Sequence, residues 1–146
     1  MSPQHLVDVH VLLIRDGTVL LSLRRSADEY DNRWHLPSGK LEVGESAAAG
    51  AVREAAEEIG VGIEPADLRL IHVAHVTAPG RPARLGLFFR AERWRGEPVN
   101  QEPDRCYAVR WFPLDDLPAE VIEYSALGID ALNSRSPYSE FGWTGR

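Results

Sequence analysis

Three glutamates occupy one short segment of the chain, at spacings that would place them on one side of a helix. Glu54, Glu57 and Glu58 are related as i, i+3 and i+4, and residues so spaced are neighbours on a helix surface. Like charges there repel by roughly 0.2–0.5 kcal/mol per pair, and residues 45–64 contain no lysine to balance them. Two interpretations stay open: a solvated acidic face, or a site for a hard cation such as Mg²⁺ or Mn²⁺, which prefers oxygen ligands.

A helix over residues 46–58 is expected to position these glutamates. Ser46 is a favourable N-cap, alanines fill the body, and Gly60 stands where a left-handed C-cap residue would fall. Gly50 interrupts the interior and costs about 1 kcal/mol relative to alanine. The helix is therefore either weaker at Gly50 or closely packed against a neighbour there.

The remaining pattern predicts an α/β domain with a mixed sheet. Apolar runs favour strands over residues 5–14, 18–23, 68–77, 84–92 and 107–112. A second helix is expected over residues 115–132, entered through Pro118, and the tail over 133–146 is expected to be loop or only partly ordered.

Composition limits the classes of protein that the chain can represent. Its 146 residues suit one domain, and 16 basic against 22 acidic residues give a net charge of −6. That balance argues against a nucleic-acid polymer or an acidic membrane as partner. The single cysteine excludes a disulfide framework and a cysteine-based zinc site. With no apolar run long enough to span a membrane and no signal-peptide pattern, we expect a soluble, cytoplasmic protein.

The segment over residues 39–61, GKLEVGESAAAGAVREAAEEIGV, carries a further pattern at fixed spacing. It resembles the Nudix box, in which glycines and charged residues recur at set positions. Two positions depart from the family's usual residues: Ala55 is smaller than the common aliphatic residue, and Ser38 replaces a glycine just before the box. The matching positions are Gly39, Glu45, Arg53, Glu54, Glu57, Glu58 and Gly60.

A later segment extends the resemblance. Residues 100–106 (NQEPDRC) and 111–118 (WFPLDDLP) look like the corresponding part of MutT-type members that act on nucleoside triphosphates. The similarity covers about residues 5–132. It implies the Nudix α/β/α sandwich, with the box as loop–helix–loop and a single Nudix domain over 1–146.

The resemblance also implies a metal-dependent chemistry. Nudix enzymes hydrolyse a nucleoside diphosphate linked to another group, and an acidic helix can hold a diphosphate only through divalent cations. Mg²⁺, or Mn²⁺ in its place, would be held by Glu54, Glu57 and Glu58 with the Gly39 carbonyl. Arg53 and Glu45 would orient this cluster by ion pairing.

Three residues outside the box are candidates for the same site. Glu102 resembles the additional acid of triphosphate members, and the general base is then Glu57, Glu58 or Glu102, between which spacing does not choose. Arg24 either contacts phosphate or is a solvated strand end. Tyr124 either stacks on the nucleobase or packs in the core.

We expect the substrate to be a small-molecule nucleotide, a nucleoside triphosphate that is ordinary, modified or oxidised, cleaved to monophosphate and pyrophosphate. ADP-ribose or another nucleotide sugar is the alternative, although the proline about 15 residues past the box in such members is replaced here by Val76. A non-catalytic nucleotide sensor is a further alternative, but such domains lose box glutamates and this chain retains them. A homodimer is compatible with the resemblance.

Overall fold

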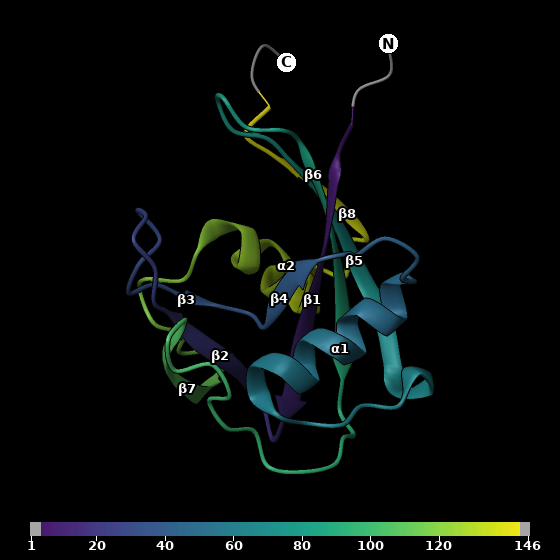
Figure 1. Cartoon of the computed structure of the whole chain (residues 1–146), viewed down its shortest axis with the longest axis vertical. Coiled ribbons are helices and arrows are strands. Elements are labelled where there is room, and N and C mark those ends of the chain that lie inside the picture. Colours follow the sequence, from purple (N-terminus) through teal and green to yellow (C-terminus); the bar gives the residue numbers. More distant parts are fainter. Residues whose placement is uncertain (1–3, 144–146) are drawn as a thin grey trace.

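The computed structural model describes residues 4–143 and shows a mixed sheet with two α-helices (Figure 1). The helices are α1 (Ala47–Ile59) and α2 (Glu123–Ser134), and a 3₁₀ turn spans Pro65–Asp67. Within the described residues, no helix is both long and apolar enough to cross a membrane. The strands are β1 (Leu6–Arg15), β2 (Thr18–Arg24), β3 (Trp34–His35), β4 (Ser38–Lys40), β5 (Leu68–Val76), β6 (Arg84–Ala91), β7 (Cys106–Pro113) and β8 (Tyr138–Phe141).

The sheet is built around β1, the long strand that runs through the middle of the molecule (Figure 1). The strand order is β3-β2-β1-β6-β5-β8, while β4 pairs with β1 and β7 with β2. The pairs β1–β6 and β5–β8 are parallel and the others are antiparallel. This arrangement confirms the expected mixed sheet and brings the N-terminal strand beside a strand about 75 residues later.

One helix covers each face of the sheet, and alternate residues of β1 serve the two layers. On one face, Val9 and Val11 pack in a core with Ala51 and Ala55 of α1. On the other face, the core joins Leu12 and Ile14 of β1, Phe88 of β6 and Ile129 of α2. The expected α/β/α layering is therefore confirmed.

The second helix is shorter at its start than the sequence pattern suggests. It begins at Glu123, so the prediction of helix over residues 115–122 was wrong. Pro118 disfavours helical backbone at the residue before it. The segment instead pairs with β3: Trp34 N donates to Glu120 O at 2.8 Å, and Ile122 N donates to Trp34 O at 2.8 Å. These bonds place the start of α2 beside β3.

The tail also differs from expectation. Residues 138–141 form β8, parallel to β5, with Val73 opposite Tyr138 and Val76 opposite Phe141. A short strand at the sheet edge with mixed polar residues has little periodicity, which explains why the pattern did not reveal it. Residues 144–146 of the predicted tail lie outside the described residues.

Candidate active site

The box helix α1 begins and ends as its capping residues predict. The Ser46 hydroxyl accepts a hydrogen bond from Ala49 N, and Gly60 adopts the left-handed conformation, with φ 70°. A Cβ on Gly50 would lie 2.5 Å from a methyl carbon of Leu41. Close packing therefore explains the interior glycine, and the helix holds its glutamates on a fixed support.

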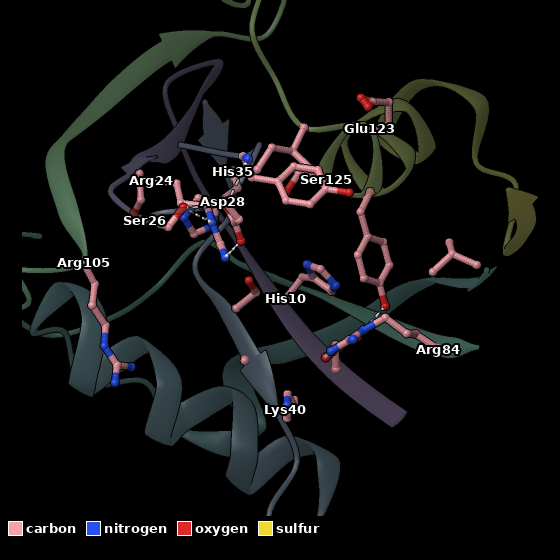
Figure 2. Close-up of a pocket in the computed structure, with 18 of the residues that line it drawn as sticks. His10, Arg24, Ser26, Asp28, His35, Lys40, Arg84, Arg105, Glu123 and Ser125 are labelled. Carbon is pink, nitrogen blue, oxygen red and sulfur yellow. Dashed lines mark hydrogen bonds and ion pairs between the residues drawn. The ribbon is translucent and has the colours of Figure 1, made fainter. Parts of the chain in front are cut away.

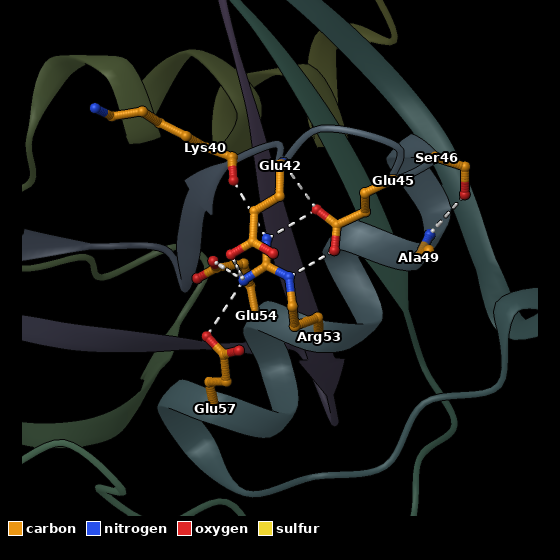
Figure 3. A network of polar contacts seen from close by, with 8 residues as sticks. All are labelled: Lys40, Glu42, Glu45, Ser46, Ala49, Arg53, Glu54 and Glu57. Carbon is orange, nitrogen blue, oxygen red and sulfur yellow. Dashed lines mark hydrogen bonds and ion pairs between the residues drawn. The ribbon is translucent and has the colours of Figure 1, made fainter.

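Arg53 is the centre of an ion-pair network that joins α1 to the loop before it (Figure 3). Its Nε and Nη2 atoms bind the two Glu45 oxygens at 2.6 and 2.9 Å. Its Nη1 atom donates to Glu54 at 2.7 Å and to Glu57 at 3.2 Å. This pairing lowers the pKa of Glu45 to about 2 and raises the pKa of Arg53, so both groups remain charged.

Two of the glutamates meet beneath the loop that precedes the helix. Glu54 is buried, and a Cβ on Gly39 would overlap its carboxylate, so a larger residue there would displace that carboxylate. The Glu58 carboxylate accepts a hydrogen bond from Ser38 N at 3.4 Å. Burial, and then the adjacent Glu54 carboxyl group, raise the pKa of Glu58 well above its usual value. Arg53 pairs with Glu54 but no cation pairs with Glu58 among the described residues, and a divalent cation would stabilise two such neighbouring carboxyl groups.

The third glutamate of the motif points elsewhere. Glu57 is half exposed and its carboxylate lies against Arg53. Over residues 4–143, no three acidic, histidine or cysteine side chains converge on one point that could hold a metal ion. The carboxylates and the Gly39 carbonyl nevertheless fit a hard divalent cation, because they are oxygen donors and Mg²⁺ keeps several waters beside a few protein ligands.

A cavity of about 740 Å³, which Glu58 lines and Glu54 does not, lies on the α2 face of the sheet (Figure 2). Its lining includes Gly39, Glu58 and Glu102. It also includes polar and aromatic side chains from β1, β6 and α2, which are Asp8, His10, Arg84 and Tyr124. Its volume is that of a site for a mononucleotide-sized ligand.

Glu102 reaches the cavity because its loop is bound to α1. Gln101 N donates to Glu58 O at 3.1 Å, and Glu102 N donates to the Asn100 side chain at 3.1 Å. Burial raises the pKa of Glu102; Arg105 opposes this increase and Glu54 adds to it. The structure thus places Glu102 and Glu58 on one cavity wall.

The two predicted substrate residues both line the cavity but have partners within the protein. Arg24 donates to Ser26 at 3.1 Å and to Asp28 at 3.0 Å. The Tyr124 hydroxyl donates to Asp8 Oδ2 at 2.8 Å. A Cβ on Gly86 would lie 2.6 Å from the Tyr124 ring, so this glycine allows the ring to approach the sheet.

Sequence reasoning missed the polar residues of β1. Asp8 and His10 are 5% and 3% exposed and lie two residues apart, so they share the α2 face of the strand. Arg84 binds both oxygens of Asp8, at 2.7 and 2.9 Å. The available signal was an aspartate and a histidine within an otherwise apolar strand, HLVDVHVLLI, because buried polar groups need partners.

Comparison with known proteins connects this geometry to a family. The family model described as NUDIX domain matches residues 4–129. The chain is 32% identical over 138 residues to a MutT-like protein of Streptomyces ambofaciens, covering 93% of this chain and 82% of that protein. It is 37% identical over 116 residues to the 8-oxo-dGTP diphosphatase of Escherichia coli K12, covering 77% and 88%.

A solved structure shares both fold and sequence. The crystal structure of a MutT NUDIX hydrolase from Burkholderia pseudomallei superposes with a TM-score of 0.80 at 32% identity. The match covers 87% of this chain and 97% of that one. The layered sheet and the position of the box helix are thus features of a known architecture.

Proposed function

The chain belongs to the Nudix hydrolase family, and we propose that it cleaves nucleoside triphosphates, oxidised purine forms among them, to monophosphate and pyrophosphate. The observation that carries this proposal is one cavity whose lining combines two kinds of residue. Glu58, Glu102 and Gly39 belong to the acidic motif, and polar and aromatic residues of β1, β6 and α2 line the same cavity. A ligand with a charged phosphate chain and a flat heterocycle matches this combination.

Divalent metal is a general requirement of Nudix hydrolases, and here we propose Mg²⁺. Glu54, Glu57 and Glu58, with the Gly39 carbonyl, would hold it. When bound, it would neutralise phosphate charge and lower the pKa of water. Rotation of the Glu57 side chain from Arg53 would bring it toward the other two carboxylates, since all three lie on one helix face.

The protein's own groups supply position and proton transfer. Arg53 and Glu45 orient the glutamates through their ion pairs. A general base must lie within reach of the attacking water, and Glu58 and Glu102 line the cavity whereas Glu57 does not. We therefore propose Glu58 or Glu102 as the base.

The names of two relatives support oxidised purine triphosphates as substrates. One is the Escherichia coli 8-oxo-dGTP diphosphatase. The other is the mouse oxidized purine nucleoside triphosphate hydrolase, which is 31% identical over 111 residues and is covered to 66% of its length. Both names describe hydrolysis of a triphosphate, the reaction that we propose for this chain.

A substrate panel with Mg²⁺ tests the proposal. It compares ordinary and oxidised nucleoside triphosphates with ADP-ribose, dinucleoside polyphosphates and coenzyme A, and identifies the phosphate products. We expect pyrophosphate and the monophosphate from a triphosphate. Stepwise release of orthophosphate would contradict the reaction, and faster cleavage of ADP-ribose would favour a nucleotide-sugar pyrophosphatase. Nucleotide binding without any turnover would favour the sensor alternative.

A further inference from the structure

His10 is a buried histidine whose ring is held in place from two sides. Its ring stacks on Phe88 with centroids 4.2 Å apart and planes 11° apart, and it meets the Tyr124 ring edge-on at 4.5 Å. A Cβ on Gly128 would overlap the Phe88 ring, so that glycine lets α2 press Phe88 toward the sheet. The orientation of His10 is thus set by packing.

Both polar atoms of His10 lack a protein partner. Among the residues that the structure describes, neither Nδ1 nor Nε2 has a hydrogen-bond partner, although both are buried. Burial lowers the pKa of His10 to about 3; Asp8 opposes this decrease, whereas His35 and Arg84 add to it. The ring is therefore neutral, with one N–H donor and one bare acceptor. Unpaired buried polar groups are rare because they forfeit the hydrogen bonds that water would make.

The charged groups beside His10 are already paired with one another. Asp8 receives two hydrogen bonds from Arg84 and one from the Tyr124 hydroxyl. Asp8 and Arg84 therefore largely offset each other's charge, while Lys40, opposite Asp8 on β4, also lines the cavity. His10 lines the cavity together with Arg84, and both are labelled in Figure 2.

The aromatic rings around His10, those of Phe88 and Tyr124, match a flat heterocycle. The lining of the cavity also includes the apolar residues Val76, Ile122 and Phe141, of which Val76 lies between Arg84 and Phe141 in the sheet. Apolar and aromatic walls with a few placed polar atoms are typical of sites for planar ligands. A sugar phosphate, which carries hydroxyls and charge on every side, matches these walls less well.

We propose that His10 is a specificity-determining residue that hydrogen-bonds the nucleobase of the substrate through a ring nitrogen. This inference rests on the proposed function, since it requires the phosphate chain to lie beside Glu58 and Glu102. Because neither nitrogen is engaged by the protein, His10 can present either the donor or the acceptor to the base edge. A binding site rejects a ligand that leaves one of its buried polar groups unpaired more strongly than a ligand that lacks only an apolar contact.

His10→Phe tests the proposal, because it keeps an aromatic ring against Phe88 and removes both nitrogens. Affinities for AMP, GMP, CMP, UMP and 8-oxo-dGMP are compared with the affinity for ribose 5-phosphate, which has no base, by calorimetry with and without Mg²⁺. We expect the variant to bind the preferred mononucleotide about tenfold more weakly and to bind ribose 5-phosphate as the wild type does.

His72→Phe is the matched control. His72 is also 3% exposed, but its nitrogens contact Ser136 O at 2.6 Å and Ser139 Oγ at 2.7 Å, and it does not line the cavity. Its replacement should leave the order of affinities unchanged. Because monophosphate binding requires no turnover, failure of the proposed reaction and failure of this inference are separate outcomes.

Three results would overturn the proposal. One is an unchanged order of mononucleotide affinities in His10→Phe. Another is an equal loss for ribose 5-phosphate, which would assign His10 to the sugar. The third is a wild type that binds no mononucleotide better than ribose 5-phosphate. Should His10→Phe fail to fold, ¹⁵N chemical shifts of the wild-type His10 ring decide: they should move with the preferred mononucleotide and stay constant with ribose 5-phosphate.

Discussion

The guanidinium of Arg53 holds the carboxylate of Glu45 in a two-point ion pair, with the Nε–Oε2 atoms 2.6 Å apart and the Nη2–Oε1 atoms 2.9 Å apart. The two residues are eight positions apart, with Glu45 just before the N-cap of α1 and Arg53 in its second turn. The same guanidinium reaches Glu54 and Glu57. It also lies 3.6 Å from Glu42, so one cation faces four carboxylates.

Arg53→Ala should destabilise the fold markedly. Removal of the guanidinium leaves Glu45 and Glu54, whose side chains are only 13% and 11% exposed, without a counter-charge. We expect a loss of about 3 kcal/mol in the free energy of unfolding, measured in urea without metal. Arg95→Ala removes the exposed pair with Glu64 and should cost about 1 kcal/mol or less. Equal effects of the two variants would contradict the central role of Arg53.

Glu57→Gln and Glu58→Gln should each lower kcat by a factor of about 100 or more, because each removes a proposed metal ligand. The fold should persist, since Glu58→Gln relieves the repulsion between two buried carboxyl groups. Mg²⁺ should raise the melting temperature of the wild type and raise that of Glu58→Gln less. Glu64→Gln, on an exposed residue outside the box helix, is the control that should retain both turnover and the Mg²⁺ response. Near-normal activity of both box variants would reject the metal site.

Gly39→Ala should disturb the site through contact and not through backbone strain. Its added Cβ would overlap the Glu54 carboxylate, and we expect kcat/KM to fall at least about tenfold as that carboxylate is displaced. Gly17→Ala is the converse control, because Gly17 has φ +74° with open space around it. It should cost about 1 kcal/mol of stability and leave kcat/KM unchanged. A Gly39→Ala enzyme with full activity would show that Glu54 need not stay in place.

Stability should fall in mild acid because of His10. Its pKa is about 3 in the fold and 6.5 when unfolded, so the unfolded chain binds the proton first and stability decreases as pH falls from about 6.5 toward 3. Between pH 7 and pH 5 the loss due to this residue should be about 2 kcal/mol. Urea unfolding at both values should show a smaller loss for His10→Phe; parallel behaviour of the two proteins would contradict a neutral, buried His10.

Local patterns were sufficient for the box helix and for most strands. Capping residues and spacing predicted α1 to within a residue at each end. Helix stability depends on capping and on contacts between side chains three or four positions apart, and both can be read from the sequence. They also predicted that three glutamates share one face. They did not predict the start of α2, which depends on hydrogen bonds to Trp34, or the strand β8, which depends on pairing with β5.

The sequence by itself determined the family, the acidic helix and the chemistry of its oxygen donors, since all of these follow from residue types at fixed short spacings. Only the tertiary structure decided which residues of β1, β6 and α2 line the cavity. Asp8 meets Arg84 across 76 residues and Tyr124 across 116, because the parallel pairing of β1 with β6 and the packing of α2 against them bring distant segments together. Contacts between residues so far apart produce no periodic pattern in the sequence. The burial of His10 and its unpaired nitrogens are therefore visible only in the folded protein.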